Sequence, residues 1–295
     1  MLAEFMLACG GISCDDSLMS AEVTAIITGA SSGFGESFAR HLARDQKCRS
    51  GDMRLHLVLI ARSREKLESL AGELRAEYGC EVSVLVCDLA AEAEREQLLV
   101  RLSSMRSEEL WLINNAGLGD YGEFISSEPE RNRRMIEVNM TAPVELTRAM
   151  LPVMLQADKA GIINIASLAA DLAIPDFAMY AASKSFVASF SEALRIELKK
   201  TNIHVTAVCP GPVHTNFGDV ARRTGKSKKE VPFRKWFYST VDCVVCTALK
   251  AVEKNKPRCY PSLKIRLAGL FVRCAPLWLL RLIMSTRPRK ATPIT

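Results

Sequence analysis

The chain contains no stretch rich in proline, glycine and serine that would act as a linker, no internal repeat and no low-complexity tract. Its 295 residues could form one large α/β domain or two smaller ones, and a chain of this length buries an ample hydrophobic core. Because no linker separates two halves, the composition favours a single domain.

The histidines and cysteines form no complete set of metal ligands at a typical spacing. The four histidines, at positions 41, 56, 204 and 214, show no spacing typical of a metal site. Cys243 and Cys246 have the spacing of a zinc or redox pair, but no second pair or nearby histidine supplies further ligands. We interpret both thiols as packing groups of an apolar helix over 241–252, capped by Ser239 or Thr240. The sequence therefore predicts no structural or catalytic metal.

The first twenty residues contain no lysine or arginine, whereas a secretory signal peptide needs a positively charged start. We expect residues 1–21 to be a poorly ordered extension, with Met19 as an alternative start. The ten cysteines are scattered, several of them in strand-like runs where a thiol acts as a small apolar group. This distribution favours a reducing compartment, and we expect a cytoplasmic protein.

Short apolar runs alternate with stretches of helical composition along most of the chain. Runs that are typical of buried strands cover residues 55–61, 82–87, 110–114, 162–166 and 204–209. Such an alternation is typical of a parallel sheet with helices on both faces. We therefore predict an α/β fold built on one sheet of this kind.

Tyr180-Ala-Ala-Ser-Lys184 places a phenol and an ammonium four residues apart, and this spacing brings them to one face of a helix. A cation held beside a phenol favours the phenolate and lowers the pKa of the hydroxyl. Ser167 lies upstream, at the end of the apolar run 162–166. The three groups can converge on one carbonyl oxygen. For the tyrosine and lysine alone, a solvated helix face is the alternative interpretation.

A glycine-rich turn follows the apolar run 23–27 and precedes a helical stretch over 36–42. Strand, glycine turn and helix start together form a phosphate cradle, because glycines permit close approach and the helix N-terminus presents free N–H groups. The glycine spacing differs from the Gly-x-Gly-x-x-Gly dinucleotide fingerprint, and a turn without a ligand is the alternative. The residues predicted to bind phosphate are Gly29, Ser31, Ser32, Gly33, Phe34 and Gly35.

These motifs, with Asn114-Asn-Ala-Gly117 between them, resemble the short-chain dehydrogenase/reductase family in its classical form. The likeness covers roughly residues 22–285. The matching positions are, in chain order, Thr28 to Gly35, Cys87 to Leu89, Asn114 to Gly117, Asn139, Ser167, Tyr180, Lys184 and Pro210 to Thr215. The resemblance implies a Rossmann-type doubly wound sheet in residues 22–264. It also implies an oxidoreductase (EC 1.1.1.-) that interconverts a ketone or aldehyde and an alcohol.

The resemblance assigns four catalytic roles. Tyr180 would be the general acid in reduction and the general base in oxidation. Lys184, with the positive nicotinamide ring, would lower the pKa of that phenol, and it would also hold the nicotinamide ribose. Ser167 would donate a hydrogen bond to the substrate oxygen, and Asn139 would hold a water that links Lys184 to solvent.

The cofactor implied is NADP(H). Arg62 follows the run 55–61 at a point where an NAD site would hold an acid, and a guanidinium can bind a 2′-phosphate. An arginine that merely caps a solvated strand end is the alternative. The other cofactor positions are Asp88 and Leu89 at the adenine, Asn115, Ala116 and Gly117 at the adenosine ribose, Tyr180 and Lys184 at the nicotinamide ribose, and Pro210, Gly211, Val213 and Thr215, of which the last two would hold the carboxamide.

Residues 217–238 would form the lid over the substrate and are strongly basic. Such a lid can attract a phosphate-bearing or carrier-bound substrate, for instance a 3-oxoacyl thioester, and a solvated mobile loop is the alternative. Asp120 and Tyr121 are expected to line the pocket, while Ile174 and Phe177 favour a lipophilic ketone or secondary alcohol.

The family also implies a homo-oligomer, a dimer or tetramer. A catalytically minor scaffold that binds nucleotide or membrane is the alternative function, and the intact catalytic residues argue against it.

The C-terminal third is basic: from Arg222 to the end there are eighteen Lys and Arg residues against three acids. Such a balance indicates an anionic partner surface. No basic platform interleaved with aromatics is visible, and no nucleic acid is expected.

In an apolar helix over 265–284, Arg266, Arg273 and Arg281 would fall within about 80° of one another and form a polar stripe. Residues 265–295 are thus predicted to form a basic amphipathic helix and tail. Peripheral membrane contact through 265–284 and packing over the cleft or a subunit interface are both open.

Overall fold

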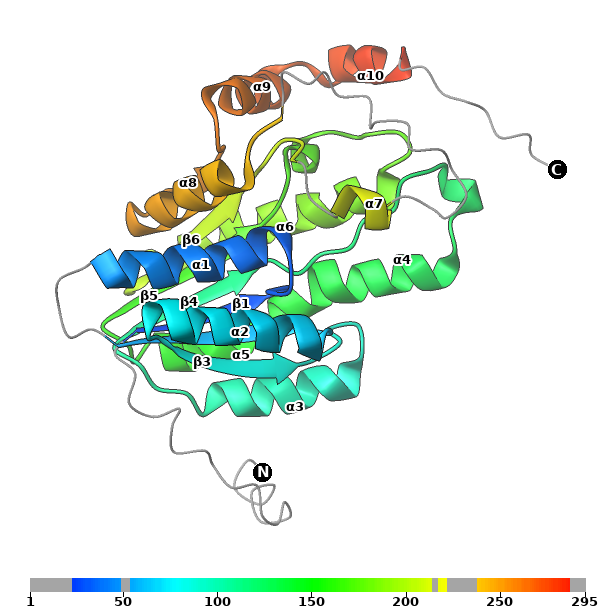
Figure 1. The fold of residues 1–295 in the computed structure, drawn as a ribbon. Coiled ribbons are helices and arrows are strands. Elements are labelled where there is room, and N and C mark those ends of the chain that lie inside the picture. Colours follow the sequence, from blue (N-terminus) through cyan, green and yellow to red (C-terminus); the bar gives the residue numbers. More distant parts are fainter. Residues whose placement is uncertain (1–22, 49–53, 214–216, 222–237, 287–295) are drawn as a thin grey trace, which may run out of the picture.

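The computed structural model describes residues 23–48, 54–213, 217–221 and 238–286 (Figure 1). They form one sheet of seven parallel strands in the order β3-β2-β1-β4-β5-β6-β7. The strands are β1 (Val23–Thr28), β2 (Leu55–Ala61), β3 (Glu81–Val86), β4 (Glu109–Asn114), β5 (Lys159–Ile165), β6 (Ile203–Val208) and β7 (Arg258–Cys259). The order runs outward in both directions from β1 and β4. This topology confirms the predicted doubly wound α/β fold.

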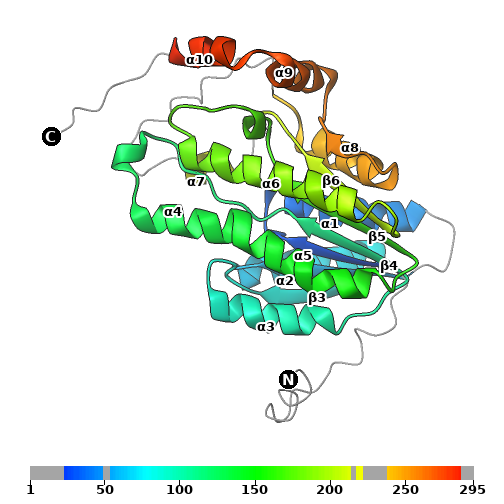
Figure 2. The ribbon, with the colours of Figure 1, turned by 180° about the vertical axis from the view of Figure 1, so that it is seen from behind.

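Helices cover both faces of the sheet, and alternate strand residues point into two separate cores. Ile27 of β1 and Leu59 of β2 lie in the first core, whereas the neighbouring Ile26 and Val58 lie in the second. The first core is covered by α1 (Gly33–Cys48), α2 (Arg64–Tyr78) and α8 (Val241–Glu253). The second is covered by α3 (Glu92–Ser103), α5 (Ala142–Met154) and α6 (Ala178–Glu197). Figure 2 shows this second layer from behind.

Every strand predicted from the sequence is present, with ends that differ by no more than a few residues. The predicted helix over 241–252 is confirmed as α8. Its N-cap is Thr240, whose hydroxyl accepts a hydrogen bond from the backbone N–H of Cys243 at 3.2 Å. The thiol of Cys243 in turn donates to the carbonyl oxygen of Pro261 at 3.1 Å, as expected of a packed side chain.

Shorter elements shape the carboxyl edge of the sheet. They are the 3₁₀ turn η3 (Phe124–Ser126), α4 (Pro129–Ile136), the π-helical turn η4 (Glu137–Thr141), the 3₁₀ turn η5 (Leu168–Asp171) and α7 (Phe217–Ala221). Parallel strands bring their carboxyl ends to one edge, so the loops that carry these turns meet there.

The C-terminal segment forms two helices, α9 (Leu263–Cys274) and α10 (Leu277–Ser285), bent by 116° relative to each other. The prediction of a single helix over 265–284 is therefore wrong. Pro276 is the reason, because proline supplies no N–H and keeps the preceding residue out of the helical region; Ala275 is extended at φ −70° and ψ 137°. A single helical wheel with one stripe of arginines therefore does not describe residues 265–284, because two helices share this segment. Among the described helices none is long and apolar enough to span a bilayer alone, although the bent pair together passes by length and composition.

Candidate active site

Ser167 lies just beyond the end of β5, where the chain turns into η5. Its backbone is extended, at φ −168° and ψ 159°, and it is the N-cap of that turn. The hydroxyl oxygen accepts a hydrogen bond from the N–H of Ala169 at 3.1 Å. This contact fixes the side chain at the carboxyl edge of the sheet and leaves its proton available to another acceptor.

Tyr180 and Lys184 lie one turn apart near the start of α6, as the spacing predicts. The Lys184 side chain is buried, and its Nζ donates to the carbonyl oxygen of Ile165 at 2.7 Å. The same Nζ lies 5.9 Å from the centroid of the Tyr180 ring. Burial lowers the pKa of Lys184 to about 8. The structure thus brings the serine, phenol and amine to the end of β5.

The pKa of Tyr180 shifts in the direction opposite to the one expected from the sequence. Loss of hydration raises it, and a hydrogen bond with the Ser167 side chain acts in the lowering direction without reversing the shift. Lys184 directs its ammonium at the Ile165 carbonyl oxygen instead of the phenol oxygen. The expectation that Lys184 lowers the pKa of Tyr180 is therefore not met by the protein groups alone.

Asn139 lies in the π-helical turn η4 and is almost fully buried. Its amide group donates to the carbonyl oxygen of Leu118 and to the hydroxyl of Ser183, both at 2.9 Å, and its Oδ1 accepts from the N–H of Leu118 at 2.7 Å. Ser183 donates in turn to the carbonyl oxygen of Tyr180 at 2.8 Å. Through these bonds Asn139 ties η4 to the helix that carries the tyrosine and lysine.

The glycine turn is bound tightly to the segment 114–117. Gly29 and Gly33 have φ of 66° and 60°, values that glycine adopts without strain. A Cβ on Gly29 would lie 2.9 Å from Nδ2 of Asn115, and one on Gly35 would strike the carbonyl oxygen of Gly29. The Thr28 hydroxyl accepts from the N–H groups of Asn115 and of the next residue at 2.9 and 3.0 Å. The glycines thus let the backbone of the turn pack closely at the N-terminus of α1, where free N–H groups can bind the phosphates of a dinucleotide.

Three cofactor candidates lie beyond β2 and β3. Arg62 is exposed directly after β2. Burial acts to raise the pKa of Asp88, but hydrogen bonds from Arg134 and the Ala90 N–H, together with the charge of Arg62, lower it overall. The bond from Arg134 to the Asp88 carboxylate measures 2.8 Å. Leu89, the other candidate here, has its side chain buried in the second core. Arg62 thus leaves an exposed guanidinium beyond β2, with no acidic side chain at that position.

The remaining cofactor candidates are placed by β4 and β6. Gly117 lies close to two of the candidate catalytic residues, because a Cβ there would lie 3.3 Å from the Lys184 Nζ and 3.5 Å from Asn139 Oδ1. Pro210 accepts a hydrogen bond from the N–H of Leu168 at 2.9 Å, which joins the segment after β6 to the serine loop. The candidates Gly211 and Val213 follow Pro210, and Thr215 lies outside the described residues. The candidates Ser31, Ser32 and Phe34 lie in the glycine turn and at the start of α1.

The substrate side is lined by aromatic and apolar groups. The Tyr180 ring lies 5.5 Å from that of Phe217 and 5.8 Å from that of Phe177, measured between centroids. Ile174 is buried beside them. Asp120, expected in the pocket, is buried in an ion pair with Arg131 at 3.1 Å. Of the predicted lid, α7 covers this site through Phe217, and residues 222–237 are outside the described part of the chain.

Sequence reasoning missed a buried polar chain under the site. Asn114 donates to Thr147 Oγ1 at 3.3 Å and to Asn164 Oδ1 at 2.8 Å, and Asn164 donates to Ser191 at 2.9 Å. These groups tie β4 and β5 to α5 and to α6, the helix that carries Tyr180 and Lys184. The available signal was an asparagine inside the otherwise apolar run 162–166, because a buried amide needs partners.

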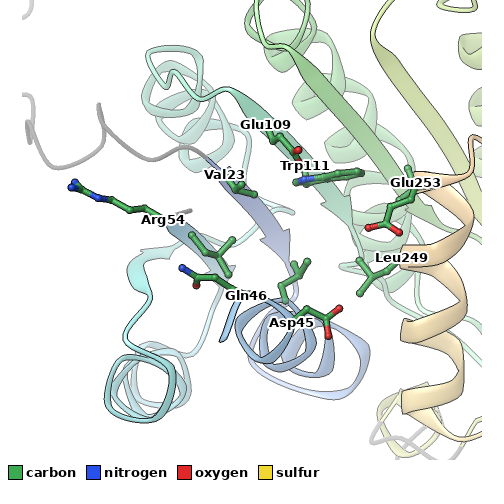
Figure 3. Close-up of a pocket in the computed structure, with 11 residues that line it drawn as sticks. Val23, Asp45, Gln46, Arg54, Glu109, Trp111, Leu249 and Glu253 are labelled. Atoms are coloured by element: carbon green, nitrogen blue, oxygen red, sulfur yellow. The ribbon is translucent and has the colours of Figure 1, made fainter. Parts of the chain in front are cut away.

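A separate pocket lies at the opposite edge of the sheet, between α1, α8 and the first residues of β1, β2 and β4 (Figure 3). Trp111 and Leu249 form apolar parts of its wall, and Arg54, Glu109 and Glu253 contribute charged groups. In open parallel sheets, ligands bind beyond the carboxyl ends of the strands. This pocket is at the amino ends and takes no part in the site described above.

Known proteins have sequences and folds similar to those of this chain. Residues 23–225 match the family model of the short chain dehydrogenases. A very-long-chain 3-oxoacyl-CoA reductase from Anas platyrhynchos is 34% identical over 204 residues, which is 67% of this chain and 62% of that protein. The match thus spans less than two thirds of the relative's length.

Among solved structures, the short-chain dehydrogenase from Sphingobium yanoikuyae in complex with NADPH superimposes with a TM-score of 0.72 at 30% identity, covering 92% of this chain and 99% of the other. The bulky-bulky ketone specific alcohol dehydrogenase from Comamonas testosteroni gives 0.69 at 27% identity, covering 92% and 98%. The family model matches most of the chain. Membership of this family explains why the glycine turn occurs together with Ser167, Tyr180 and Lys184. The chain belongs to the short-chain dehydrogenase family of oxidoreductases, which use NAD(P)(H).

Proposed function

We propose that this chain is an NADP(H)-dependent reductase of lipophilic ketones, including 3-oxoacyl thioesters, with Tyr180 as the general acid. The observation that carries the proposal is the meeting of Ser167, Tyr180 and Lys184 at the end of β5, opposite Gly117. A bound nicotinamide cofactor supplies the hydride. The protein groups then have to hold the carbonyl oxygen and deliver a proton to it.

Each group has a distinct task in carbonyl reduction. The Tyr180 hydroxyl donates its proton to the carbonyl oxygen, and its raised pKa keeps it protonated near neutrality. The Ser167 hydroxyl donates a hydrogen bond to the same oxygen as negative charge develops. Lys184 supplies a positive charge near the phenol below its pKa of about 8. Asn139 positions the helix that carries both groups through Ser183.

Substitution of the phenol tests the catalytic assignment. Tyr180→Phe should lower turnover of a ketone by at least about 10²-fold, because the proton donor is lost. NADPH affinity should stay nearly unchanged, since the phosphates are held at the glycine turn. Tyr78→Phe, on α2, is the control and should keep wild-type turnover. A Tyr180→Phe variant that retains more than a tenth of wild-type turnover would contradict the assignment.

The preference for NADPH rests on Arg62, which is exposed after β2 with no acidic side chain at that position. Arg62→Ala should weaken NADPH by roughly ten- to a hundredfold, which corresponds to about 1.5–3 kcal/mol for a charge-assisted contact, and should barely affect NADH. Arg64→Ala is the matched control, because that exposed side chain pairs with Glu68 at 3.9 Å. Fluorescence titrations with both cofactors provide the measurement. Equal losses for NADPH and NADH would show that Arg62 does not recognise the 2′-phosphate.

The substrate class is supported by the aromatic and apolar surroundings of Tyr180 and by two similar proteins. Ile174, Phe177 and Phe217 present apolar surface beside the phenol. One relative is named as a very-long-chain 3-oxoacyl-CoA reductase, and one solved structure as a dehydrogenase specific for bulky ketones. A panel of ketones, aldehydes and 3-oxoacyl thioesters, measured by NADPH consumption, tests this choice. Faster reduction of short polar aldehydes than of any lipophilic ketone would contradict it.

A further inference from the structure

Large apolar side chains are exposed at the C-terminal end of the described chain. We call the following set the C-terminal apolar surface: Leu263, Leu267, Leu270, Phe271, Leu277, Trp278, Leu282 and Ile283. All eight belong to α9 and α10, and they make up half of the large hydrophobic residues that are exposed in the described structure. Trp278 is 66% exposed and Leu263 is 69% exposed. Exposed apolar surface of this density marks a contact with another phase or molecule.

One face of α9 is docked on the domain, and the opposite face is not. Ile265 is fully buried, and Gly269 lies so close to Tyr260 that a Cβ there would meet the tyrosine ring at 2.5 Å. The Tyr260 hydroxyl donates to Asp171 of η5 at 3.3 Å, so α9 rests on the turn that follows Ser167. Leu267 and Phe271 belong to the opposite face and are 57% and 52% exposed.

The second helix has almost no support from the domain. No residue of α10 is buried. Figure 1 and Figure 2 both place α9 and α10 on the same side of the molecule, with α10 extending away from the sheet. A helix this apolar and this exposed is not stabilised by the packing seen in the domain.

Basic side chains border the C-terminal apolar surface. On α9, Arg266 and Arg273 fall between the docked face and the exposed apolar face, at about 300° and 280° on a wheel that starts at Leu263. Lys264 lies on the other border, at about 100°. On α10, Arg281 lies within the exposed apolar face and not at its border, and all three arginines are exposed. Long basic side chains beside apolar ones are suited to an interface where the stems meet hydrocarbon and the charges meet anionic groups.

We propose that α9 and α10 bind in the plane of an anionic lipid surface, through the C-terminal apolar surface and the arginines within and beside it. Charge decides between a lipid surface and a second copy of this chain. No aspartate or glutamate follows Glu253, so a symmetric contact through this surface would bring basic side chains against one another without acids to pair them. Anionic head groups supply the opposite charge, and the acyl region receives Leu, Phe and Trp side chains.

Vesicle sedimentation with the full chain tests the proposal. Wild type should sediment with vesicles of phosphatidylcholine and phosphatidylglycerol at low salt, and much less with phosphatidylcholine alone. Replacing Arg266, Arg273 and Arg281 with Gln should lower the apparent affinity by at least about tenfold. Replacing Phe271, Trp278 and Leu282 with Ser should abolish binding. Raising the salt concentration should weaken wild-type binding, because the charges are screened.

Matched control variants test whether vesicle binding requires this surface or only exposed charge and apolar side chains anywhere on the protein. Arg101, Arg148 and Lys199, all exposed elsewhere, are replaced together with Gln to remove the same charge. Val100, Leu155 and Ile196, which are 71%, 50% and 61% exposed, are replaced together with Ser. Both control variants should bind vesicles as wild type does, and circular dichroism should show that all variants fold. In Trp278→Phe, the fluorescence blue shift that vesicles induce should shrink while binding remains.

Three outcomes would overturn the proposal. The first is no sedimentation of wild type with anionic vesicles at low salt. The second is an equal loss of binding in a control variant. The third is a wild-type dimer in sedimentation equilibrium that the Phe271, Trp278 and Leu282 replacement converts to monomer, because a second copy would then occupy the surface. NADPH-dependent turnover of a soluble ketone does not depend on this surface, so failure here leaves the proposed function unaffected.

Discussion

At the scale of single residues, the proton chemistry of the site depends on how Tyr180 and Lys184 are solvated. Burial raises the pKa of Tyr180 and lowers that of Lys184 to about 8. Lys184 directs its ammonium at the Ile165 carbonyl oxygen, 2.7 Å away, so the phenol gains little from it. At neutral pH the tyrosine therefore stays protonated, which is the form that donates to a carbonyl oxygen. In the proposed reduction, Tyr180 therefore starts in the protonated form that the general acid needs.

The glycines offer a residue-scale test of the cofactor cradle. Gly29→Ala should weaken NADPH binding by more than about tenfold, because alanine is strained at φ 66° and its Cβ would lie 2.9 Å from Asn115 Nδ2. Gly72→Ala in α2 is the matched control, since no atom lies within 4 Å of its added Cβ. It should raise stability by up to about 1 kcal/mol and leave NADPH affinity unchanged. Equal NADPH affinities in the two variants would contradict the cradle.

At the scale of elements, a buried arginine connects three helical segments around the site. The Arg95 side chain of α3 is 4% exposed, and it pairs with Glu137 of η4 at 2.9 Å and with Glu145 of α5 at 2.8 Å. It also donates to the carbonyl oxygen of Leu89 at 2.9 Å. Because η4 carries Asn139, this network supports the turn that is hydrogen bonded to α6 through Ser183.

Removing that guanidinium should destabilise the fold. Arg95→Met keeps most of the apolar stem but leaves both glutamates and the Leu89 carbonyl without their partner. The glutamate side chains are 37% and 36% exposed and can be hydrated, so we expect a loss of about 1–3 kcal/mol rather than the larger loss of a fully buried pair. Urea unfolding measures it. Arg101→Gln, on the exposed side of the same helix, should change stability by less than about 0.5 kcal/mol, and an Arg95→Met effect as small as that would exclude a structural role for the network.

At the scale of the whole molecule, the sheet buries the ring of His56, whose protonation in acid opposes folding. His56 of β2 is fully buried and hydrogen bonds to the Ser83 hydroxyl of β3 at 2.8 Å, and its Nδ1 has no partner among the described residues. Burial lowers the pKa of His56 to about 4 from an ordinary value of 6.5. The unfolded chain therefore binds a proton at this group more readily than the folded one does.

The sign of the pH dependence follows from that lowered pKa. The stability that neutral His56 provides is complete above about pH 6.5 and is lost as the pH falls through about 4, up to on the order of 3 kcal/mol. His56→Gln should flatten the fall in unfolding free energy between those pH values, while Ser83 keeps a hydrogen-bond partner. Thermal or urea unfolding between pH 4 and 6.5 measures this pH dependence. Each protein is compared with itself at pH 8, which removes the part of the stability change that the substitution causes at every pH. An unchanged acid slope in His56→Gln would contradict the assignment.

Local pattern alone determined most of the fold and the main features of the site. The strand over 55–61 was readable because a strand covered on both faces is a continuous apolar run. Thr240 could be named as one of two candidate caps of α8 because capping depends on neighbouring residues. Tyr180 and Lys184 share a helix face through the 3.6-residue period, which also needs no distant contact. The break at Pro276 was equally local, and one helical wheel drawn through it gave the wrong result for that segment.

Only the tertiary structure decided the properties that depend on burial and on contacts between distant residues. The direction of the Tyr180 pKa shift required knowing how much water the phenol loses and that Lys184 bonds to Ile165. The pairing of Asn114 with Asn164 joins residues on adjacent strands, and no local pattern specifies it. Likewise the sequence shows that α9 is apolar, but only its docking on Tyr260 selects which face is buried and which is exposed. Hydration and charge interactions depend on distances in space, and the fold sets those distances after the local elements have formed.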